Sequence, residues 1–166
     1  MPVTSLNVLS PDVEPVFRGR RARLVGAHHA NSLGELRGVL ERCLDDAPSP
    51  VTLDLIGHST RDHHLLRLGQ TPIDMLDPQV ARFFRELATT RWLERLEVVA
   101  VRLLGCETVA TDSGRRTLRL LSRTLRLPVF GTTKPVGKNH YNERGFDPEF
   151  ARILVEAAAT TRTGSR

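Results

Sequence analysis

The chain has 166 residues, of which 40% are hydrophobic and 26% charged, as expected for one globular domain that buries its core without disulfides or metal. No apolar run of 18 residues is present, and residues 1–15 lack a basic stretch followed by an apolar one. We therefore expect neither a membrane-spanning helix nor a secretory signal, and a cytoplasmic location. The net charge is +5, but 22 of the 24 basic residues are arginines, a skew typical of GC-rich coding, and aromatic residues are scarce. Charge alone therefore does not favour a nucleic-acid partner.

The first part of the chain predicts an arm, a strand and a helix. Residues 1–20 are Pro-rich and unpatterned, which predicts an irregular N-terminal arm. Within residues 21–29, the apolar run 24–27 predicts a short buried strand. Residues 31–46 predict an amphipathic helix, capped at Asn31 or Ser32.

The middle of the chain predicts two further strands and a second helix. Residues 51–57, "VTLDLIG", read as a buried strand, and residues 65–69, "LLRLG", as a short extension or hairpin arm closed by Gly69. Residues 77–92 predict a helix with Asp77 as its cap. Residues 96–105 form the strongest strand pattern of the chain.

The last part continues the alternation of strands and helices. Residues 113–126 predict a helix, residues 128–133 a strand, and residues 148–159 a final helix. Together, the elements predict an α/β fold: a mostly parallel sheet with helices on both faces, within a single domain over residues 21–160. Residues 161–166 read as a flexible tail.

His58 and Cys106 each follow a predicted strand. Because the carboxyl ends of parallel strands lie at one edge of a sheet, we expect both residues at that edge, where ligands and chemistry collect. Either residue alone is more often structural than catalytic. Their joint placement, with Gly57 and Gly105 directly before them, favours a functional pair. A cysteine and a histidine can hydrolyse an acyl compound without a cofactor.

The segments around these two residues resemble a known family. "LDLIGHST" (53–60) and "VRLLGCETVATDSG" (101–114) are similar to the His- and Cys-bearing strand ends of caspase-like cysteine peptidases. His58 lies 48 positions before Cys106, and caspases have about 50. The likeness is greatest to bacterial caspase-like domains of the CHAT type, which have an arm like "LLRLG" and a strand like "PVFGTT". The resemblance covers residues 22–133 and implies a three-layer caspase-like sandwich.

The resemblance also implies roles for particular residues. Cys106 would be the nucleophile and His58 the general acid, and the backbone amides of Ser59 and Cys106 would form the oxyanion hole. The chain departs from caspases in having Ser59 where they have glycine after the histidine. It also has "LGCET" in place of their Gln-Ala-Cys-Arg-Gly signature. The match is therefore to the wider clan rather than to true caspases.

Four residues are candidates for the substrate pocket. The resemblance puts a pocket wall at His28 and His29, where caspases have an arginine that binds aspartate. Related peptidases that cut after Arg or Lys place acidic residues around the pocket, and Glu107 or Asp112 could serve, although Asp112 is equally suited to cap a helix. Residues 134–146 are either a specificity loop or a plain connector.

The other histidines and the second cysteine receive structural interpretations. His63 and His64 are adjacent on an extended arm and would point to opposite faces, and no ligand spacing supports a zinc site. We therefore expect no metal or other cofactor. Cys43 lies on the apolar face of its helix and is expected to pack in the core, and two cysteines are too few for a disulfide framework.

Three functions remain as hypotheses. The first is a cysteine endopeptidase that acts on a protein or peptide through a Cys106 thioester. The second is a catalytically inactive caspase-like module that binds partner proteins. The third is a basic nucleic-acid-binding protein that uses Arg115, Arg119 and Arg123, which share one face of the predicted helix.

Overall fold

The computed structural model describes residues 2–17, 24–46 and 48–157. The strands are β1 (Thr4–Leu9), β2 (His28–His29), β3 (Val51–Ile56), β4 (Arg67–Leu68), β5 (Thr71–Pro72), β6 (Val98–Leu104), β7 (Val129–Thr132), β8 (Tyr141–Asn142), β9 (Gly145–Phe146) and β10 (Leu154–Glu156). The α-helices are α1 (Leu33–Cys43), α2 (Pro78–Thr90), α3 (Trp92–Arg95) and α4 (Asp112–Leu125). The 3-10 helices are η1 (Pro11–Phe17), η2 (Lys138–His140) and η3 (Pro148–Ile153).

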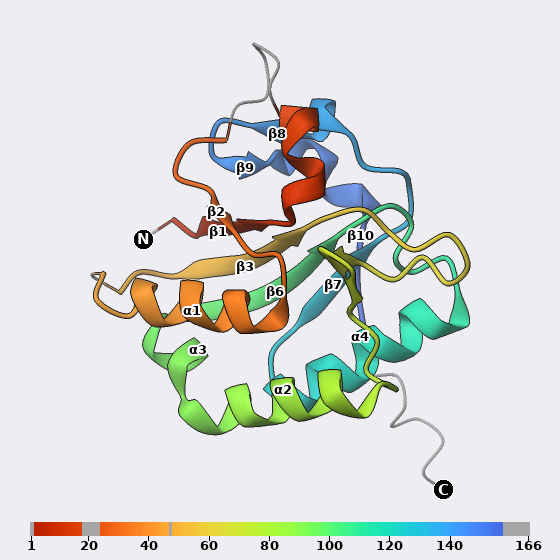
Figure 1. Ribbon diagram of the computed structural model, residues 1–166. Coiled ribbons are helices and arrows are strands. Elements are labelled where there is room, and N and C mark those ends of the chain that lie inside the picture. The colour runs from red at the N-terminus through yellow and green to blue at the C-terminus, as the bar shows by residue number, and fades with distance from the viewer. Residues whose placement is uncertain (1, 18–23, 47, 158–166) are drawn as a thin grey trace, which may run out of the picture.

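A six-stranded sheet organises the molecule (Figure 1). Its strand order is β10-β7-β6-β3-β1-β2, and only β10 runs antiparallel to its neighbour among these described strands. The predicted α/β class with a mostly parallel sheet is therefore confirmed.

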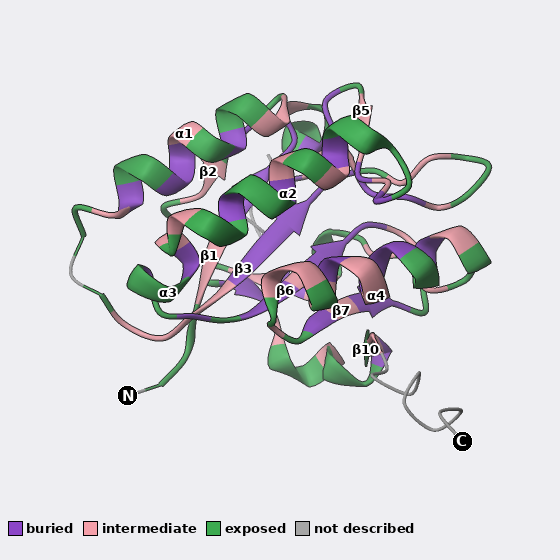
Figure 2. Cartoon of the chain, turned by 90° about the horizontal axis from the view of Figure 1, so that it is seen from below, coloured by how far each residue is buried: buried purple, intermediate pink, exposed green. Residues whose placement is uncertain are grey.

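The two faces of the sheet are covered differently. The α-helices α1, α2 and α4 lie over one face, as seen in Figure 1 and from below in Figure 2. Elements on the opposite side include η1, the β8–β9 hairpin and η3, which contribute to a separate apolar cluster. Helices were expected on both faces. Among the described residues, the α-helices lie on one face and the 3-10 helices η1 and η3 lie on the other.

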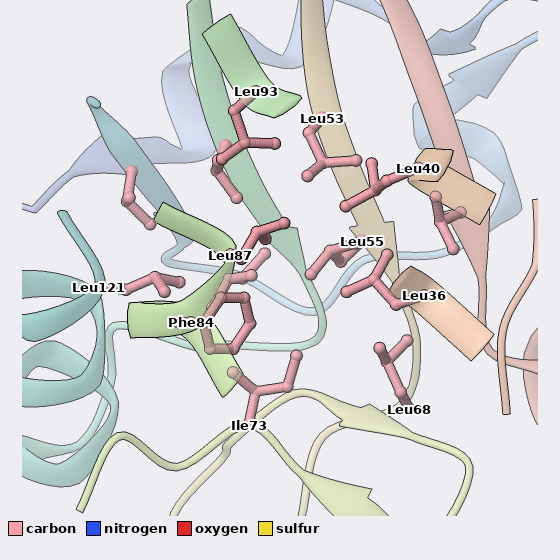
Figure 3. Packing of buried hydrophobic residues seen from close by; sticks show 14 of the residues in the cluster. Leu36, Leu40, Leu53, Leu55, Leu68, Ile73, Phe84, Leu87, Leu93 and Leu121 are labelled. Atoms are coloured by element: carbon pink, nitrogen blue, oxygen red, sulfur yellow. The ribbon is translucent and has the colours of Figure 1, made fainter. Parts of the chain in front are cut away.

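The larger apolar cluster lies between the sheet and the α-helices. Figure 3 shows how side chains from α1, β3 and α2 pack against one another there. Phe84, at 1% exposure, packs among fully buried leucines of the neighbouring elements, such as Leu36 and Leu55. Burying one such side chain contributes about 1.5–3 kcal/mol, so this layer fixes the positions of the strands.

The smaller apolar cluster, called the hairpin-side cluster below, covers the other face near the carboxyl ends of the strands. Its buried members are Leu9, Val13, Phe17, Ile56, Leu104, Tyr141, Phe146 and Ile153.

The six predicted central elements are confirmed. They appear as α1, β3, α2, β6, α4 and β7, close to the expected bounds. Ser32 caps α1 by accepting a hydrogen bond from the Glu35 amide, and Asp77 caps α2 in the same way from Gln79. The expected arm is the β4–β5 hairpin, and Gly69 at its turn has a φ of 59°, which glycine adopts most easily.

The predicted N-terminal arm is wrong for residues 4–9. These residues form β1, which lies between β3 and β2 and pairs with β3 from Thr4↔Val51 to Leu9↔Ile56. The sequence "TSLNVL" is too polar to signal a central strand. Asn7 is buried all the same, because its side chain donates a hydrogen bond to the Arg144 carbonyl of the covering hairpin.

Two further predictions need correction. Residues 24–27 form no strand, and the parallel pairing with β1 begins only at His28. The last predicted helix is the short η3 followed by β10, because Leu154, Val155 and Glu156 pair with the edge of β7. The parts of these predictions on residues 21–23 and 158–159, and the predicted tail 161–166, lie outside the described residues.

Candidate functional site

The ends of β3 and β6 bring His58 and Cys106 to one edge of the sheet. The two strands are parallel neighbours with Ile56 opposite Leu104, and His58 and Cys106 each lie two residues farther along. The Ser59 hydroxyl donates a hydrogen bond to the Cys106 carbonyl at 2.8 Å. The Ser59 side chain therefore links the end of β3, next to His58, to the backbone of Cys106.

The β4 arm fixes the backbone of His58. The Arg67 amide donates to the His58 carbonyl at 2.9 Å, and the Thr60 amide donates to the Leu65 carbonyl at 2.8 Å. The imidazole of His58 is exposed and has no hydrogen-bond partner among the described residues. It is thus free to meet a group that enters from solvent.

The sulfur of Cys106 contacts the chain that follows β7. The Val136 amide donates to Sγ at 3.4 Å, and Sγ lies 3.7 Å from the Val136 carbonyl oxygen. Within the described residues, Sγ makes no hydrogen bond to His58. The structure therefore places the two predicted catalytic residues on adjacent strand ends without joining their side chains.

Two backbone N–H groups at this edge have no hydrogen-bond acceptor among the described residues. Neither the Ser59 amide nor the Cys106 amide has an acceptor in the part of the chain that the structure describes. These are the two amides that the resemblance assigns to an oxyanion hole. Unpaired N–H groups at neighbouring strand ends can stabilise a developing negative charge on oxygen.

The glycines before the two site residues have a packing role. A Cβ at Gly57 would lie 2.3 Å from the Arg67 carbonyl oxygen, and one at Gly105 would lie 2.6 Å from the Ser59 hydroxyl. A Cβ at these distances would force the neighbouring atoms to shift, so glycine at both positions allows the arm and the strand ends to approach this closely.

Buried threonines support the turn at Cys106, and sequence reasoning missed this role. The Thr132 hydroxyl donates to the Gly105 carbonyl and accepts from the Thr108 amide at 3.2 Å. The Thr132 amide in turn donates to the Thr108 hydroxyl at 2.8 Å. No local pattern in the sequence marks these two residues as partners.

A buried ion pair beneath the site was also missed. Arg102 binds Asp54 through two hydrogen bonds, with Nε–Oδ1 at 2.7 Å and Nη2–Oδ2 at 2.5 Å, and donates to Ser5 at 3.2 Å. Burial raises the pKa of Asp54, and the hydrogen bonds from Arg102 act in the opposite direction. Asp54 lies four positions before His58, and Arg102 lies four positions before Cys106 on the adjacent strand. This equal spacing is visible in the sequence.

Tyr141 covers the same region. Burial raises its pKa, and its hydroxyl has no hydrogen-bond partner among the described residues. The phenol is therefore neutral and serves mainly as apolar cover in the hairpin-side cluster.

The predicted pocket histidines do not lie beside the pair. β2 is separated from β3 by β1, so His28 and His29 are two strands away from His58. The His28 imidazole Nε2 lies 3.7 Å from Cys43 Sγ on α1. His29 lines a cavity of about 340 Å³ together with Leu9, Glu14, Phe17, Leu24, Gly26 and Ala27, a lining that does not include His58 or Cys106.

The contact between His28 and Cys43 favours neutral groups. Burial lowers the pKa of His28, and Arg42 lowers it further, whereas Asp46 acts in the opposite direction. Burial also raises the pKa of the Cys43 thiol. Cys43 is 5% exposed and belongs to the larger core cluster, which confirms its predicted place in the core.

The two acidic pocket candidates have different positions. Glu107 adjoins Cys106 in a left-handed backbone conformation, with φ of 54°, and its amide donates to the Lys134 carbonyl at 3.2 Å. Asp112 is the first residue of α4 and forms an ion pair with Arg115. Asp112 therefore lies at a helix terminus, where the capping side chain is that of Thr111.

The adjacent histidines form part of the loop next to α4. The His63 carbonyl accepts a hydrogen bond from Thr111, and His64 has a left-handed backbone conformation. Within residues 2–17, 24–46 and 48–157, no group of three His, Cys, Asp or Glu side chains is placed to hold a metal ion. No described helix is both long and apolar enough to cross a bilayer.

Comparison with known proteins adds no relative: no family model matches the chain, and no curated protein or solved structure matches it either.

Proposed function

We propose that the protein is a cysteine endopeptidase of the caspase-like kind, with Cys106 as nucleophile and His58 as general acid. The observation that carries this proposal is the pairing of two adjacent parallel strand ends, joined by the hydrogen bond from Ser59 to the Cys106 carbonyl. The open edge beyond them has an exposed imidazole, a half-buried thiol and two unpaired amides. The family assignment itself rests on the resemblance of the two strand-end segments.

The reaction follows from these groups. The Cys106 thiol passes its proton to His58 as Sγ attacks the carbonyl carbon of the peptide bond, and the amides of Ser59 and Cys106 hold the resulting oxyanion. The C–N bond then breaks, and His58 gives its proton to the departing amine. This leaves a thioester on Cys106, which water hydrolyses to a free carboxylate and the regenerated thiol.

A second function is favoured by the position of Sγ. Because the sulfur contacts Val136 and not His58, the same fold could serve as an inactive caspase-like module that binds a partner protein. In that case the paired strand ends would have only a packing role.

Cleavage of fluorogenic peptides that vary the residue before the scissile bond separates the two functions. The peptidase predicts that Cys106→Ala and His58→Ala each lower the rate by about 10³-fold or more. Cys43→Ala is the matched control, because it removes the other thiol from a site remote in the fold, and should retain activity. Equal cleavage by wild type and Cys106→Ala would contradict the proposal.

A further inference from the structure

The chain beyond β7 runs alongside the turn at Cys106, to which two backbone hydrogen bonds connect it. The Val109 amide donates to the Thr132 carbonyl at 3.0 Å, and the Glu107 amide donates to the Lys134 carbonyl at 3.2 Å. As the donor changes from Val109 to Glu107, the acceptor changes from Thr132 to Lys134, so the two segments run antiparallel. Residues 133–137 are called the strap below. Backbone hydrogen bonds to a neighbouring segment are also how many proteins hold a bound peptide.

Val136 presents its backbone to the sulfur and its side chain to the apolar cluster. Its amide and its carbonyl both face Cys106 Sγ, at 3.4 and 3.7 Å. Its partly buried side chain packs against the hairpin-side cluster. A substrate residue whose carbonyl is about to acylate the sulfur needs the same relation, with that carbonyl close to the nucleophile and its side chain held by a pocket.

The strap is not arranged to be cut. The amide nitrogen that would leave belongs to Gly137, and it donates to His140 Nδ1 at 3.0 Å instead of facing His58. The His140 amide also donates to the Gly137 carbonyl at 3.0 Å. Among the described residues, the Val136 carbonyl receives no hydrogen bond from the backbone amide of Ser59 or that of Cys106. The strap is thus bound at the sulfur in an unproductive position.

The surroundings of Val136 suit an apolar residue. The members of the hairpin-side cluster are Leu, Val, Ile, Phe and Tyr, and Tyr141 there is neutral. The buried carboxylate of Asp54 is already paired with Arg102, so neither charge is free for an acidic or basic substrate residue.

We propose, on the basis of the peptidase function proposed above, that Val136 is a built-in pseudosubstrate residue. The strap occupies the position of the peptide to be cleaved, and an incoming peptide has to displace it. The residue that replaces Val136 at the scissile bond is apolar and of medium size, such as valine.

Alkylation of Cys106 by iodoacetamide tests the occupancy of the site without requiring turnover. Val136→Ala removes the side chain that anchors the strap and should raise the alkylation rate of Cys106 about 10-fold. Val155→Ala, at an exposed valine on β10, is the matched control and should leave the rate unchanged. A second variant, His140→Ala, releases Gly137 and should also accelerate alkylation. Unchanged alkylation rates in both Val136→Ala and His140→Ala, with wild-type melting temperatures, would overturn the proposal.

Peptide aldehydes that copy the strap test the preference for an apolar residue. The sequence Thr-Lys-Pro-Val with a terminal aldehyde should protect Cys106 from iodoacetamide, since Sγ adds to the aldehyde carbon and the thiol proton passes to its oxygen. Protection should require at least about 10-fold less of this compound than of the versions ending in Asp or Arg. Equal or better protection by a charged version would overturn the apolar preference.

Cleavage assays keep this inference distinct from the function on which it rests. If Val136→Ala and His140→Ala both accelerate alkylation of Cys106 but neither wild type nor Val136→Ala cleaves any peptide, the peptidase proposal fails while occupancy of the site by the strap stands. If peptides are cleaved but Cys106 is alkylated in Val136→Ala and His140→Ala at the wild-type rate, only the pseudosubstrate proposal fails.

Discussion

The protein contains two cysteine–histidine neighbourhoods that differ in almost every physical respect. Cys43 and His28 are in direct contact, with sulfur and nitrogen 3.7 Å apart, between α1 and β2. Cys106 and His58 stand on adjacent strand ends, and their side chains share no hydrogen bond within the described residues. Distance alone would select the first pair as the reactive one.

The surroundings of the two pairs instead favour Cys106 and His58 as the reactive pair. Burial raises the pKa of Cys43 and lowers that of His28, so both are held in their neutral forms, in which a thiol is a poor nucleophile. Near Cys106 and His58 the sheet ends in solvent, the Ser59 amide has no acceptor among the described residues, and the strap already lies against the sulfur. A contact between two reactive side chains is therefore weaker evidence for chemistry than an open edge with unused donors.

The largest expected contrast is in thiol reactivity. At pH 7, iodoacetamide should modify Cys106 about 100-fold faster than Cys43 or more, because Cys43 is inaccessible until the helix region opens. Peptide mass spectrometry of timed samples measures both rates in one experiment. In guanidinium chloride the two rates should converge. Faster labelling of Cys43 in the folded protein would reverse the assignment of the two sites.

A smaller effect is expected from filling the space at Gly57. In Gly57→Ala the added methyl group meets the Arg67 carbonyl, so the β4 arm has to shift, and we expect the free energy of unfolding to fall by about 2 kcal/mol. Thermal or urea denaturation measures the change.

Gly38→Ala provides the matched control for this substitution. Its new methyl group on α1 would meet only the end of the Arg42 side chain at 3.4 Å, and alanine favours the helix by about 0.5–1 kcal/mol. A Gly57→Ala protein as stable as Gly38→Ala would show that the arm is not fixed by this close approach.

The sequence allowed the strong central elements to be predicted but not the cover on the other face. β3 and β6 are apolar runs with clear bounds, so the edge that carries His58 and Cys106 could be anticipated. β1 could not, because its buried Asn7 is stabilised by Arg144, a residue 137 positions away. β10 was missed for a related reason: its short segment follows a convincing helix start at Asp147 and Pro148.

The candidate site, like the fold, could be predicted from the sequence only in part. Spacing and strand ends point to Cys106 and His58, and the structure brings these strand ends together. His28 does not lie next to Cys106, because β1 separates β2 from β3, and Asp112 lies at the start of α4. Their roles in a substrate pocket stay predictions. The strap could not be predicted to contact Cys106, since that contact depends on where the chain turns after β7.

The smallest expected effect concerns His28 and pH. Its pKa lies below the ordinary value of 6.5, mainly because of burial, so the unfolded chain binds a proton here more readily than the folded protein does. The stability that His28 contributes is complete above pH 6.5 and is lost as the pH falls through its lowered pKa. Urea denaturation between pH 7 and pH 5 should therefore show a smaller loss of stability in His28→Gln than in wild type. Parallel curves would mean that the imidazole is protonated equally in both states, and the contrast between a neutral buried pair and an open reactive edge would lose its electrostatic basis.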